Sequence, residues 1–537
     1  MSRLLILLIT LFLPLSRLWA QSTADTIPAT QDSVQILEIL YADKQGFKKL
    51  DSLTSLQLLV GHVQVKQGTT LFFCDSAVFN QTTRILEAFG HVHINDNDSI
   101  HAYGQYLQYF TRTKIAYLKK KVRLTDGKSN LYAEDMSYDI NQKIGEYLNK
   151  GRLEKGQTLL TSEEATYFAD VKDIYFKKNV QVTDPQYTLT ADSLLYNTDL
   201  ELTTFLSSTT IIDSSKRKIY TKEGFYDKRN RKAYFGQRPL LLDGAVTVQA
   251  NDISTNDSTG VSILTGNAVY QDSAQNIAVL ANWITSNRKL SSFQAAQHPL
   301  LIIKQDNDSL FLTADSLNSG KLSSLLSQSD SAKVNLADTG MATAGEPDSL
   351  TRYFNAYRNV RIFSDSLQAI ADSLFYSGKD SVFRLFQRPV IWTQANQISG
   401  DTIYLQTRNK KAKQLDVFEN GFMINKVRTE LLNQVKATRI RGFFEEGILQ
   451  EIRAKGNAQS VYYIQDEDSS FVGINKAEGD VINLRFTDRS LNRVIFLNAV
   501  KGTLYPISQF PESEKKLRNF SWLEELRPKD RYALMED

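Results

Sequence analysis

The chain has 537 residues, with 63 lysine and arginine residues against 60 aspartate and glutamate residues and a formal net charge of +3 at pH 7. This near-neutral balance gives no electrostatic basis for binding a nucleic acid, so we predict no nucleic-acid partner. Aromatic residues make up 10% of the sequence, including 24 Tyr and 28 Phe, and there are only 10 prolines. Because aromatic and β-branched residues favour strands, the composition indicates an all-β protein.

The first twenty residues, MSRLLILLITLFLPLSRLWA, have the layout of a cleaved secretory signal. Arg3 precedes an apolar run from Leu4 to Leu15, and the small residue Ala20 closes the segment. The apolar run is short for a membrane span but typical of a signal peptide. We therefore predict a signal peptide over residues 1–20 that is cleaved near Ala20, then a flexible linker over residues 21–34, and an exported mature chain.

After the linker, two short sequence patterns alternate with one common period. The first pattern, as in YTLTADSLLYN (187–197), ends on an aromatic or equivalent residue. Its end positions follow one another in steps of 29 or 30 residues: Phe79, Tyr109, Tyr138, Tyr167, Tyr196 and Tyr226. The second pattern, as in GHVQV (61–65) and KNVQV (178–182), recurs between them with the same spacing. Two independent patterns with one period indicate an internal structural repeat.

Within a repeat, apolar and polar residues alternate as they do in a half-buried strand. In KNVQV, for example, Val180 and Val182 share one face and Gln181 lies on the other. A unit this short cannot fold alone, so stacked units predict an elongated two-sheet repeat ladder with units of about 29–30 residues. If each unit adds one strand to each sheet, some fifteen units extend roughly 70 Å.

The repeats fall into two regions, which we predict at residues 35–318 and 351–508. Between them, residues 319–350 are rich in Ser, Asp, Ala and Gly and poor in aromatic residues. This composition predicts a flexible low-complexity insertion, because it offers little apolar surface to bury.

The last segment, residues 509–537, is predicted to be a short helical tail that docks on the repeats as a cap. Pro511 is placed to begin a helix and Pro528 to end it. Between them, three apolar residues would share one helical face: Phe520, Leu523 and Leu526.

A catalytic site would need a group of residues that stands out from the repeats, and the sequence contains none of the familiar motifs. The nucleophile elbow, the P-loop, HExxH and paired CxxC are all missing. We therefore predict no enzymatic activity and no cofactor. His91, His93 and His101 are the best candidates for a metal site, but HVH falls where another copy carries Gln181, so we predict no metal.

Two other residue types receive structural interpretations. Asp-Ser pairs recur at 75–76, 192–193, 315–316 and 372–373, one per unit, so they are spread along the ladder. We predict that they stabilise strand bends, because Asp and Ser readily bond to nearby backbone. Cys74, the only cysteine, stands where other copies have Ala and is predicted to be a small buried residue.

The feature that does recur in every unit is an apolar stripe. The simplest interpretation is a core packed between two sheets. The functional alternative is that the sheets splay and leave an apolar trough suited to a long acyl chain. The residues predicted to line it are Val63, Val65, Val92, Ile94, Val122, Leu124, Tyr138, Tyr167, Val180, Val182, Leu189 and Tyr196.

The alternating units L-x-A-D-x-L-x-Y and G-x-V-x-[VI] resemble the OstA-like family of periplasmic lipopolysaccharide-transport bridge proteins. The best matches are LTADSLLYN (189–197), ILYADKQGF (39–47), GHVQV (61–65) and GHVHI (90–94), and the likeness covers most of residues 35–505. The resemblance implies an open, twisted β-jellyroll whose interior carries lipid A acyl chains without catalysis. This chain is longer than a single-domain bridge and resembles a long variant.

The resemblance also implies a location and partners. The ligand would be lipopolysaccharide or another lipid A-type glycolipid, bound in the periplasm. The partners would be the inner- and outer-membrane lipopolysaccharide-transport components, together with end-to-end self-association.

Two alternative hypotheses remain open. One is a β-solenoid-like structural or adhesin protein of the cell envelope with a closed core. The other is a glycan-binding or glycan-processing enzyme, which the dispersed carboxylates disfavour. An open interior would favour transport, and a closed interior would favour the scaffold.

Overall fold

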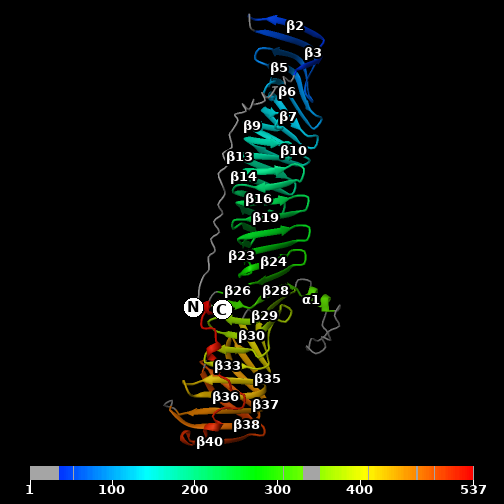
Figure 1. The fold of residues 1–537 in the computed structure, drawn as a ribbon. Coiled ribbons are helices and arrows are strands. Elements are labelled where there is room, and N and C mark those ends of the chain that lie inside the picture. Colours follow the sequence, from blue (N-terminus) through cyan, green and yellow to red (C-terminus); the bar gives the residue numbers. More distant parts are fainter. Residues whose placement is uncertain are drawn as a thin grey trace, which may run out of the picture.

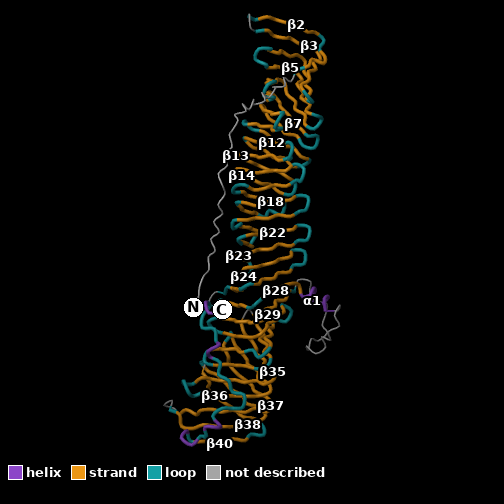
Figure 2. Tube along the Cα trace, viewed as in Figure 1, coloured by secondary structure: helices purple, strands orange, loops and turns teal. Residues whose placement is uncertain are grey.

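A computed structural model describes residues 36–51, 54–305, 308–329, 351–408, 411–466, 470–488 and 490–535. The predicted signal peptide and linker lie outside the described residues. The described chain is an elongated ladder of antiparallel strands (Figure 1), and strands dominate along its whole length (Figure 2). The predicted all-β, elongated fold is therefore confirmed.

Hydrogen bonds join all 40 strands of the described residues into one continuous ladder. The first third contains β1 (Glu38–Tyr41), β2 (Lys44–Lys49), β3 (Ser55–Gln67), β4 (Thr70–Asn80), β5 (Ile85–Asp96), β6 (Ile100–Phe110), β7 (Ile115–Thr125), β8 (Asn130–Asp139), β9 (Ile144–Tyr147), β10 (Gly151–Lys155), β11 (Thr158–Ser162), β12 (Glu164–Phe168), β13 (Asp173–Asp184) and β14 (Tyr187–Asn197).

The middle of the ladder has mostly shorter strands. They are β15 (Leu202–Phe205), β16 (Thr209–Asp213), β17 (Lys218–Thr221), β18 (Glu223–Asp227), β19 (Lys232–Gly236), β20 (Leu240–Asp243), β21 (Val246–Gln249), β22 (Asp252–Asn256), β23 (Val261–Asp272), β24 (Ile277–Asn287), β25 (Ser292–Ala296), β26 (Leu300–Ile303), β27 (Leu310–Thr313) and β28 (Ser316–Lys321).

The last part follows the short helix α1 (Leu322–Ser329). It contains β29 (Arg352–Phe363), β30 (Gln368–Ser377), β31 (Val382–Phe386), β32 (Val390–Thr393), β33 (Asn396–Ser399), β34 (Thr402–Arg408), β35 (Lys411–Lys426), β36 (Leu432–Glu445), β37 (Ile448–Gln465), β38 (Phe471–Thr487), β39 (Ser490–Leu497) and β40 (Lys501–Tyr505).

Long strands such as β3 bend at a bulge, where two residues lie opposite a single residue of the next strand. In β3, Val60 pairs with Ser76 and Val63 pairs with Cys74, so Gly61 and His62 form a bulge between them. Both bulge residues have a positive φ, 81° and 44°. Glycine and asparagine tolerate this left-handed backbone best, which explains why they recur at the bends: Gly90, Asn179, Gly266, Asn359, Asn420 and Gly456.

Each bend divides a long strand into two halves, and the two halves lie in two sheets that face each other. We call one layer the tyrosine sheet, because it carries the repeat tyrosines such as Tyr138, and the other the valine sheet, because it carries pairs such as Val180 and Val182. Both β5 and β6 cross from one sheet to the other within a single unit. A unit thus adds two strands to each sheet, about 10 Å of ladder, not the one strand predicted from the sequence.

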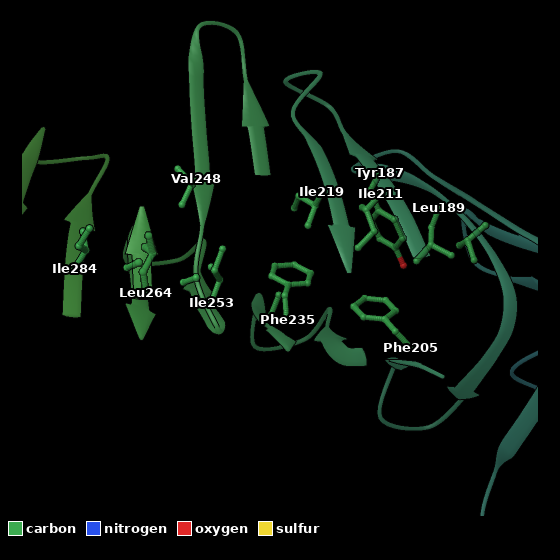
Figure 3. Packing of buried hydrophobic residues seen from close by; sticks show 14 of the residues in the cluster. Tyr187, Leu189, Phe205, Ile211, Ile219, Phe235, Val248, Ile253, Leu264 and Ile284 are labelled. Carbon is green, nitrogen blue, oxygen red and sulfur yellow. The ribbon is translucent and has the colours of Figure 1, made fainter. Parts of the chain in front are cut away.

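The interior between the sheets is packed with apolar side chains. One continuous buried cluster runs from Leu59 in β3 to Phe486 in β38. Figure 3 shows the middle of the ladder, where Ile219 lies on one side of the core and Phe205 and Phe235 lie on the other. These two phenylalanine rings stack with centroids 6.1 Å apart. Burying each large apolar side chain contributes about 1.5–3 kcal/mol, so the core holds the two sheets together.

The C-terminal tail differs from the continuous helix that we predicted over residues 509–537. Its described part forms only single 3-10 turns (Figure 2): η2 (Ile507–Gln509), η3 (Glu512–Glu514), η4 (Glu524–Leu526) and η5 (Tyr532–Leu534). Pro511 does precede a turn, but the chain then runs back along the outside of the last strands (Figure 1).

Side chains of the ladder explain why the tail is not an α-helix. The Gln434 amide donates to Lys515 O over 2.7 Å and accepts from Leu517 N–H over 2.9 Å. Gln397 binds Ser521 O and Leu523 N–H in the same way. These backbone groups are satisfied by the sheet, so they are not available for bonds within a helix.

The predicted insertion begins later than the sequence suggested. Residues 319–321 complete strand β28, where Ser319 pairs with Phe354 and Lys321 pairs with Arg352. Helix α1 follows, and residues 330–350 lie outside the described residues. Among the described residues, no helix is both long and apolar enough to cross a membrane.

Candidate functional site

All twelve residues predicted to line the interior point into the core between the sheets. Their exposed fractions lie between 0% and 3%. In β13 the alternation is as expected, because Val180 and Val182 are buried while Gln181 is exposed. They are Val63, Val65, Val92, Ile94, Val122, Leu124, Tyr138, Tyr167, Val180, Val182, Leu189 and Tyr196.

Between β3 and β14 the interior is closed by these side chains. A closed core is what the scaffold hypothesis expects, since a trough would leave the lining residues partly exposed. A lipid can therefore enter only if the two sheets separate. The edges of the ladder decide whether such a separation is feasible.

The two long edges of the sandwich are built differently. At one edge the bends carry the chain itself from sheet to sheet. At the opposite edge, tyrosine hydroxyls reach across to turns of the valine sheet. Tyr109 Oη donates to the Gln67 amide oxygen, and Tyr138 Oη donates to Asp96 Oδ2 over 2.8 Å. Each tyrosine meets a residue 42 positions earlier, about one and a half units.

The same arrangement continues along this edge. Tyr167 Oη lies 3.4 Å from Asp126 Oδ2, and Tyr226 Oη donates to the Gln186 amide over 3.1 Å. We call these contacts the edge clasps. Because they are side-chain contacts, breaking them leaves the backbone ladder of each sheet intact.

A lysine takes the tyrosine's place in one clasp. Lys228 Nζ donates to Asp184 Oδ2 over 2.7 Å, and the Thr158 hydroxyl donates to the same oxygen over 2.6 Å. Burial by itself raises the pKa of the Asp184 carboxyl, but these hydrogen bonds outweigh it, so the pKa is lowered. This clasp is therefore a paired charge at neutral pH.

Burial also fixes the protonation of the tyrosines. It raises the pKa of Tyr138 far above its ordinary value, and the hydrogen bond to Asp96 raises that pKa further. Asp96 itself is only 4% exposed and also accepts from the Thr70 hydroxyl over 3.0 Å. The tyrosine hydroxyls are thus neutral donors, and a bond from such a donor to a buried carboxylate is a strong one.

The recurrent aspartates lie at the bends, not at a common centre. Asp75 Oδ2 is 2.8 Å from His91 Nδ1, and Asp315 accepts from Asn359 over 2.9 Å. In each case the carboxylate meets the side chain of a left-handed bend residue. The predicted position at strand bends is confirmed for these two Asp-Ser pairs, but these aspartates bond to distant side chains and not, as predicted, to nearby backbone.

The three candidate metal-binding histidines are not gathered. His93 Nε2 and His101 Nδ1 lie 3.1 Å apart, but His91 turns to Asp75 instead. Within the described ranges, no group of three or more potential ligands surrounds a common point. Cys74 is buried, as predicted, and burial raises the pKa of its thiol to about 12.

A row of paired side chains crosses the outer face of the valine sheet. Its ring pairs are closely stacked: His93 and Tyr103 lie 4.4 Å apart with their planes 4° from parallel. The Arg123 guanidinium lies 4.3 Å from the Tyr103 ring centre, and that of Arg152 lies 4.6 Å from Tyr132. We call this the aromatic–arginine row, and its members in strand order are Phe73, His93, Tyr103, Arg123, Tyr132 and Arg152.

A hollow of about 940 Å³ opens along this row. Cations outnumber carboxylates in its lining. The charged lining residues are Lys121, Arg123, Lys150, Arg152, Glu134 and Glu163. The hollow lies on the outside of the sandwich, separate from the predicted interior path.

Sequence reasoning missed this row, although a signal was present. Tyr103 and Tyr132 are 29 residues apart, and so are Arg123 and Arg152. They occupy the same two repeat positions in successive units. The alternation of apolar and polar residues predicts only that these positions face the solvent, and it does not distinguish one polar side chain from another.

Comparison with known proteins finds one family. Residues 35–192 match the family described as OstA-like protein. The crystal structure of LptH is also similar. It is described as the LptA homologous periplasmic component of the conserved lipopolysaccharide transport device from Pseudomonas aeruginosa. The sequences are 20% identical, the alignment covers 21% of this chain and 82% of that chain, and the TM-score is 0.19. No curated protein matches.

Proposed function

We propose that this protein, whose residues 35–192 match the OstA-like family, is a non-catalytic periplasmic bridge for lipopolysaccharide transport to the outer membrane. Lipid acyl chains would lie between the two sheets, against the twelve predicted lining residues. The lipid would be lipopolysaccharide or a related lipid A-type glycolipid.

The observation that carries this proposal is the unbroken apolar interior combined with an edge held by side chains. The buried cluster extends from β3 to β38 without interruption. Opening the clasped edge would expose that interior along the ladder while the bends keep the sheets attached. A closed scaffold has no need for one edge that opens without breaking backbone hydrogen bonds.

The energetics of opening are compatible with lipid entry. Breaking a hydrogen bond to a charged group such as Asp96 costs about 1.5–3 kcal/mol. Each methylene group transferred from water into an apolar interior contributes about 0.8 kcal/mol. The acyl chains would cover again the apolar side chains that the separating sheets uncover. A few methylenes of one chain would then offset one clasp, and a glycolipid with several long chains would offset many.

Both ends of the ladder are suited to association with a further β-protein. At one end, β2 pairs only with β3 among the described strands, and Phe47 within it is 68% exposed. At the other end, β40 pairs with β38, and Leu504 is 66% exposed. Free strand edges of this kind accept another strand. End-to-end stacking, or docking on membrane-bound transport components, would extend the path.

Site-specific photo-crosslinking tests the proposal. A photoreactive residue is placed at Val182, which is 2% exposed, or at its exposed neighbour Thr183, in cells that make labelled lipopolysaccharide. We expect lipid adducts from position 182 and few from position 183. If a folded, exported protein gives adducts from neither position, the transport function is wrong and the closed scaffold is favoured.

A further inference from the structure

We infer that the outer face of the valine sheet between β20 and β26 is a docking site for a segment of a partner protein that has the chemistry of this chain's own C-terminal tail. The apolar side chains of the site are partly exposed. We call them the bare strip: Leu240, Leu242, Val269, Leu280 and Ile302. The strip lies outside the sandwich, so the inference stands whether or not the interior holds lipid.

The tail shows what this kind of face binds. Beyond β30 the tail lies on the outer face of the same sheet, and Phe422 and Ile424 of the sheet form one apolar cluster with Leu517 of the tail. Gln397 and Gln434 each bond to one carbonyl and one N–H of the tail backbone. The face therefore holds an irregular segment through apolar contacts and through side-chain bonds to its backbone.

The bare strip continues the face that the tail covers. Residues directly opposite each other in an antiparallel pair lie on one face of a sheet, and the pairing register here forms one line across the strands. Under the tail this line passes through Gln434, Gln397 and Gln368, and farther along the sheet it passes through Phe363, Phe311 and Ile302. It then reaches Gln271 in β23.

Gln271 is the free counterpart of the glutamines under the tail. All three of those glutamines bond to the tail, and Gln368 does so by accepting from Arg527 Nε over 2.8 Å and from Nη2 over 2.6 Å. Gln271 is partly exposed, and within the described ranges its side-chain amide has no hydrogen-bond partner. The strip thus repeats the combination found under the tail, apolar side chains beside an outward-facing amide.

The end of the tail lies next to the strip. The last turn of the tail, η5, contacts β29. A hollow of about 370 Å³ lies between the tail and the sheet near this point, and its lining includes Phe363, Gln368 and Arg527. A segment on the strip would extend the cover of the sheet from the end of the tail to β20.

The apolar character of the strip is not a general property of the outer face. Gln181 in β13 occupies the repeat position of Val269 in β23, because each follows the bend of its strand by the same number of residues. Nearer the N-terminus the same face carries the aromatic–arginine row. A contiguous apolar group on this face is thus specific to the strip, and such groups mark interaction surfaces.

The size of the strip selects the occupant. Its strands, β20, β21, β23, β24 and β26, cover about 24 Å, and two outward residues on each give a width of about 14 Å. The resulting area of roughly 340 Å² is well below the about 800 Å² per partner that a stable interface between folded proteins buries. A second copy packed face to face is therefore a poorer fit than one chain segment of about 10–15 residues.

Fluorescence anisotropy with the full-length mature protein, whose own tail stays in place, tests the inference. The probe is a labelled synthetic peptide of residues 511–531, and the comparison is the same peptide with Phe520→Ser, Trp522→Ser and Leu523→Ser. We expect saturable binding of the probe and at least tenfold weaker binding of the comparison peptide, because the strip contacts apolar side chains. Absence of saturable binding, or equal binding of the two peptides, would overturn the inference.

Variants of the protein locate the binding. The strip variant, Leu280→Asn with Ile302→Asn, should weaken the probe at least tenfold. The control, Leu159→Asn with Ile212→Asn, changes two residues that are 37% and 38% exposed on the outer face of the same sheet, outside the strip. It should leave the affinity within twofold. Equal losses in the two double variants would refute the site.

Two other results would assign the surface differently and also overturn the inference. Loss of binding in Gln434→Ala, with the strip variant unaffected, would show that the probe displaces the tail from its own site. Self-association, or binding to phosphatidylethanolamine vesicles, that is lost in the strip variant would show that a second copy or a membrane is the occupant. Lipid crosslinking at Val182 should be unchanged in every variant, so this inference and the proposed function fail independently.

Discussion

The edge clasp between Tyr138 and Asp96 gives the most direct test of how the sandwich is closed. Tyr138→Phe removes the hydroxyl that donates to Asp96 Oδ2 over 2.8 Å, and Asp96→Asn removes the charge that accepts it. Neither change alters the volume of the core appreciably. Tyr117→Phe serves as a control, because Tyr117 is 43% exposed and lies outside the core.

The expected magnitude follows from burial and hydrogen bonding. The Tyr138 ring is fully buried and Asp96 is 4% exposed, so water cannot replace the lost partner. A hydrogen bond to a charged group contributes about 1.5–3 kcal/mol, and each single change should cost that much locally. Since both changes act on the same bond, Tyr138→Phe by removing it and Asp96→Asn by removing its charge, the double variant should cost about 1–2 kcal/mol less than the sum of the single variants.

Native-state hydrogen exchange is the appropriate assay, because repeat ladders open locally instead of unfolding all at once. Amides of β5 to β8 should exchange faster in each single variant, while those of β30 to β34 should not change. The Tyr117→Phe control should match the wild type. A coupling energy below about 0.3 kcal/mol between Tyr138 and Asp96 would refute the view that the clasp closes the edge.

Three further predictions concern other parts of the ladder. The folded-state pKa of Asp184 is lowered below its unfolded value of about 3.9, so its clasp stabilises the fold above that pH and is lost as the pH falls through the folded pKa. Between pH 7 and pH 3, the melting temperature should therefore fall less in Asp184→Asn than in the wild type. Deleting residues 509–537 uncovers the outer apolar cluster that contains Phe422, so the variant should bind a hydrophobic dye and melt at a lower temperature; unchanged dye binding would contradict this. Gly90→Ala should cost about 1–3 kcal/mol, since a Cβ would lie 2.2 Å from Asp75 Oδ2. In contrast, Gly127→Ala, which has a similar φ of 83° but nothing within 4 Å, should cost less by equilibrium denaturation.

The sequence predicted the core well because local alternation decides it. The pattern in KNVQV places Val180 and Val182 inside and Gln181 outside, and the structure agrees. The repeat length also emerged from the sequence. The number of strands per unit did not, because a bulge such as Gly61–His62 lets one strand serve both sheets, and two left-handed residues leave little trace in an apolar pattern.

Features that depend on distant residues were beyond sequence reasoning. The tail was predicted to be helical from Pro511 and Pro528, but Gln434 binds its backbone across 81 and 83 positions. The edge clasps were equally hidden, since Tyr138 and Asp96 are separated by 42 positions and belong to different units. No local pattern identifies which polar residue a buried tyrosine will meet.

The two-strand unit has a consequence for how the length of such a protein changes. A chain that enters and leaves each unit in the same sheet, running in the same direction, can gain or lose a whole unit without disturbing its neighbours. Duplication of about 29 residues would lengthen the ladder by about 10 Å. Duplication of half that number would have to join strand ends that lie in opposite sheets and run in the wrong direction. The length of the ladder therefore changes in steps of one whole unit, and it depends on the number of units and not on the size of any one of them.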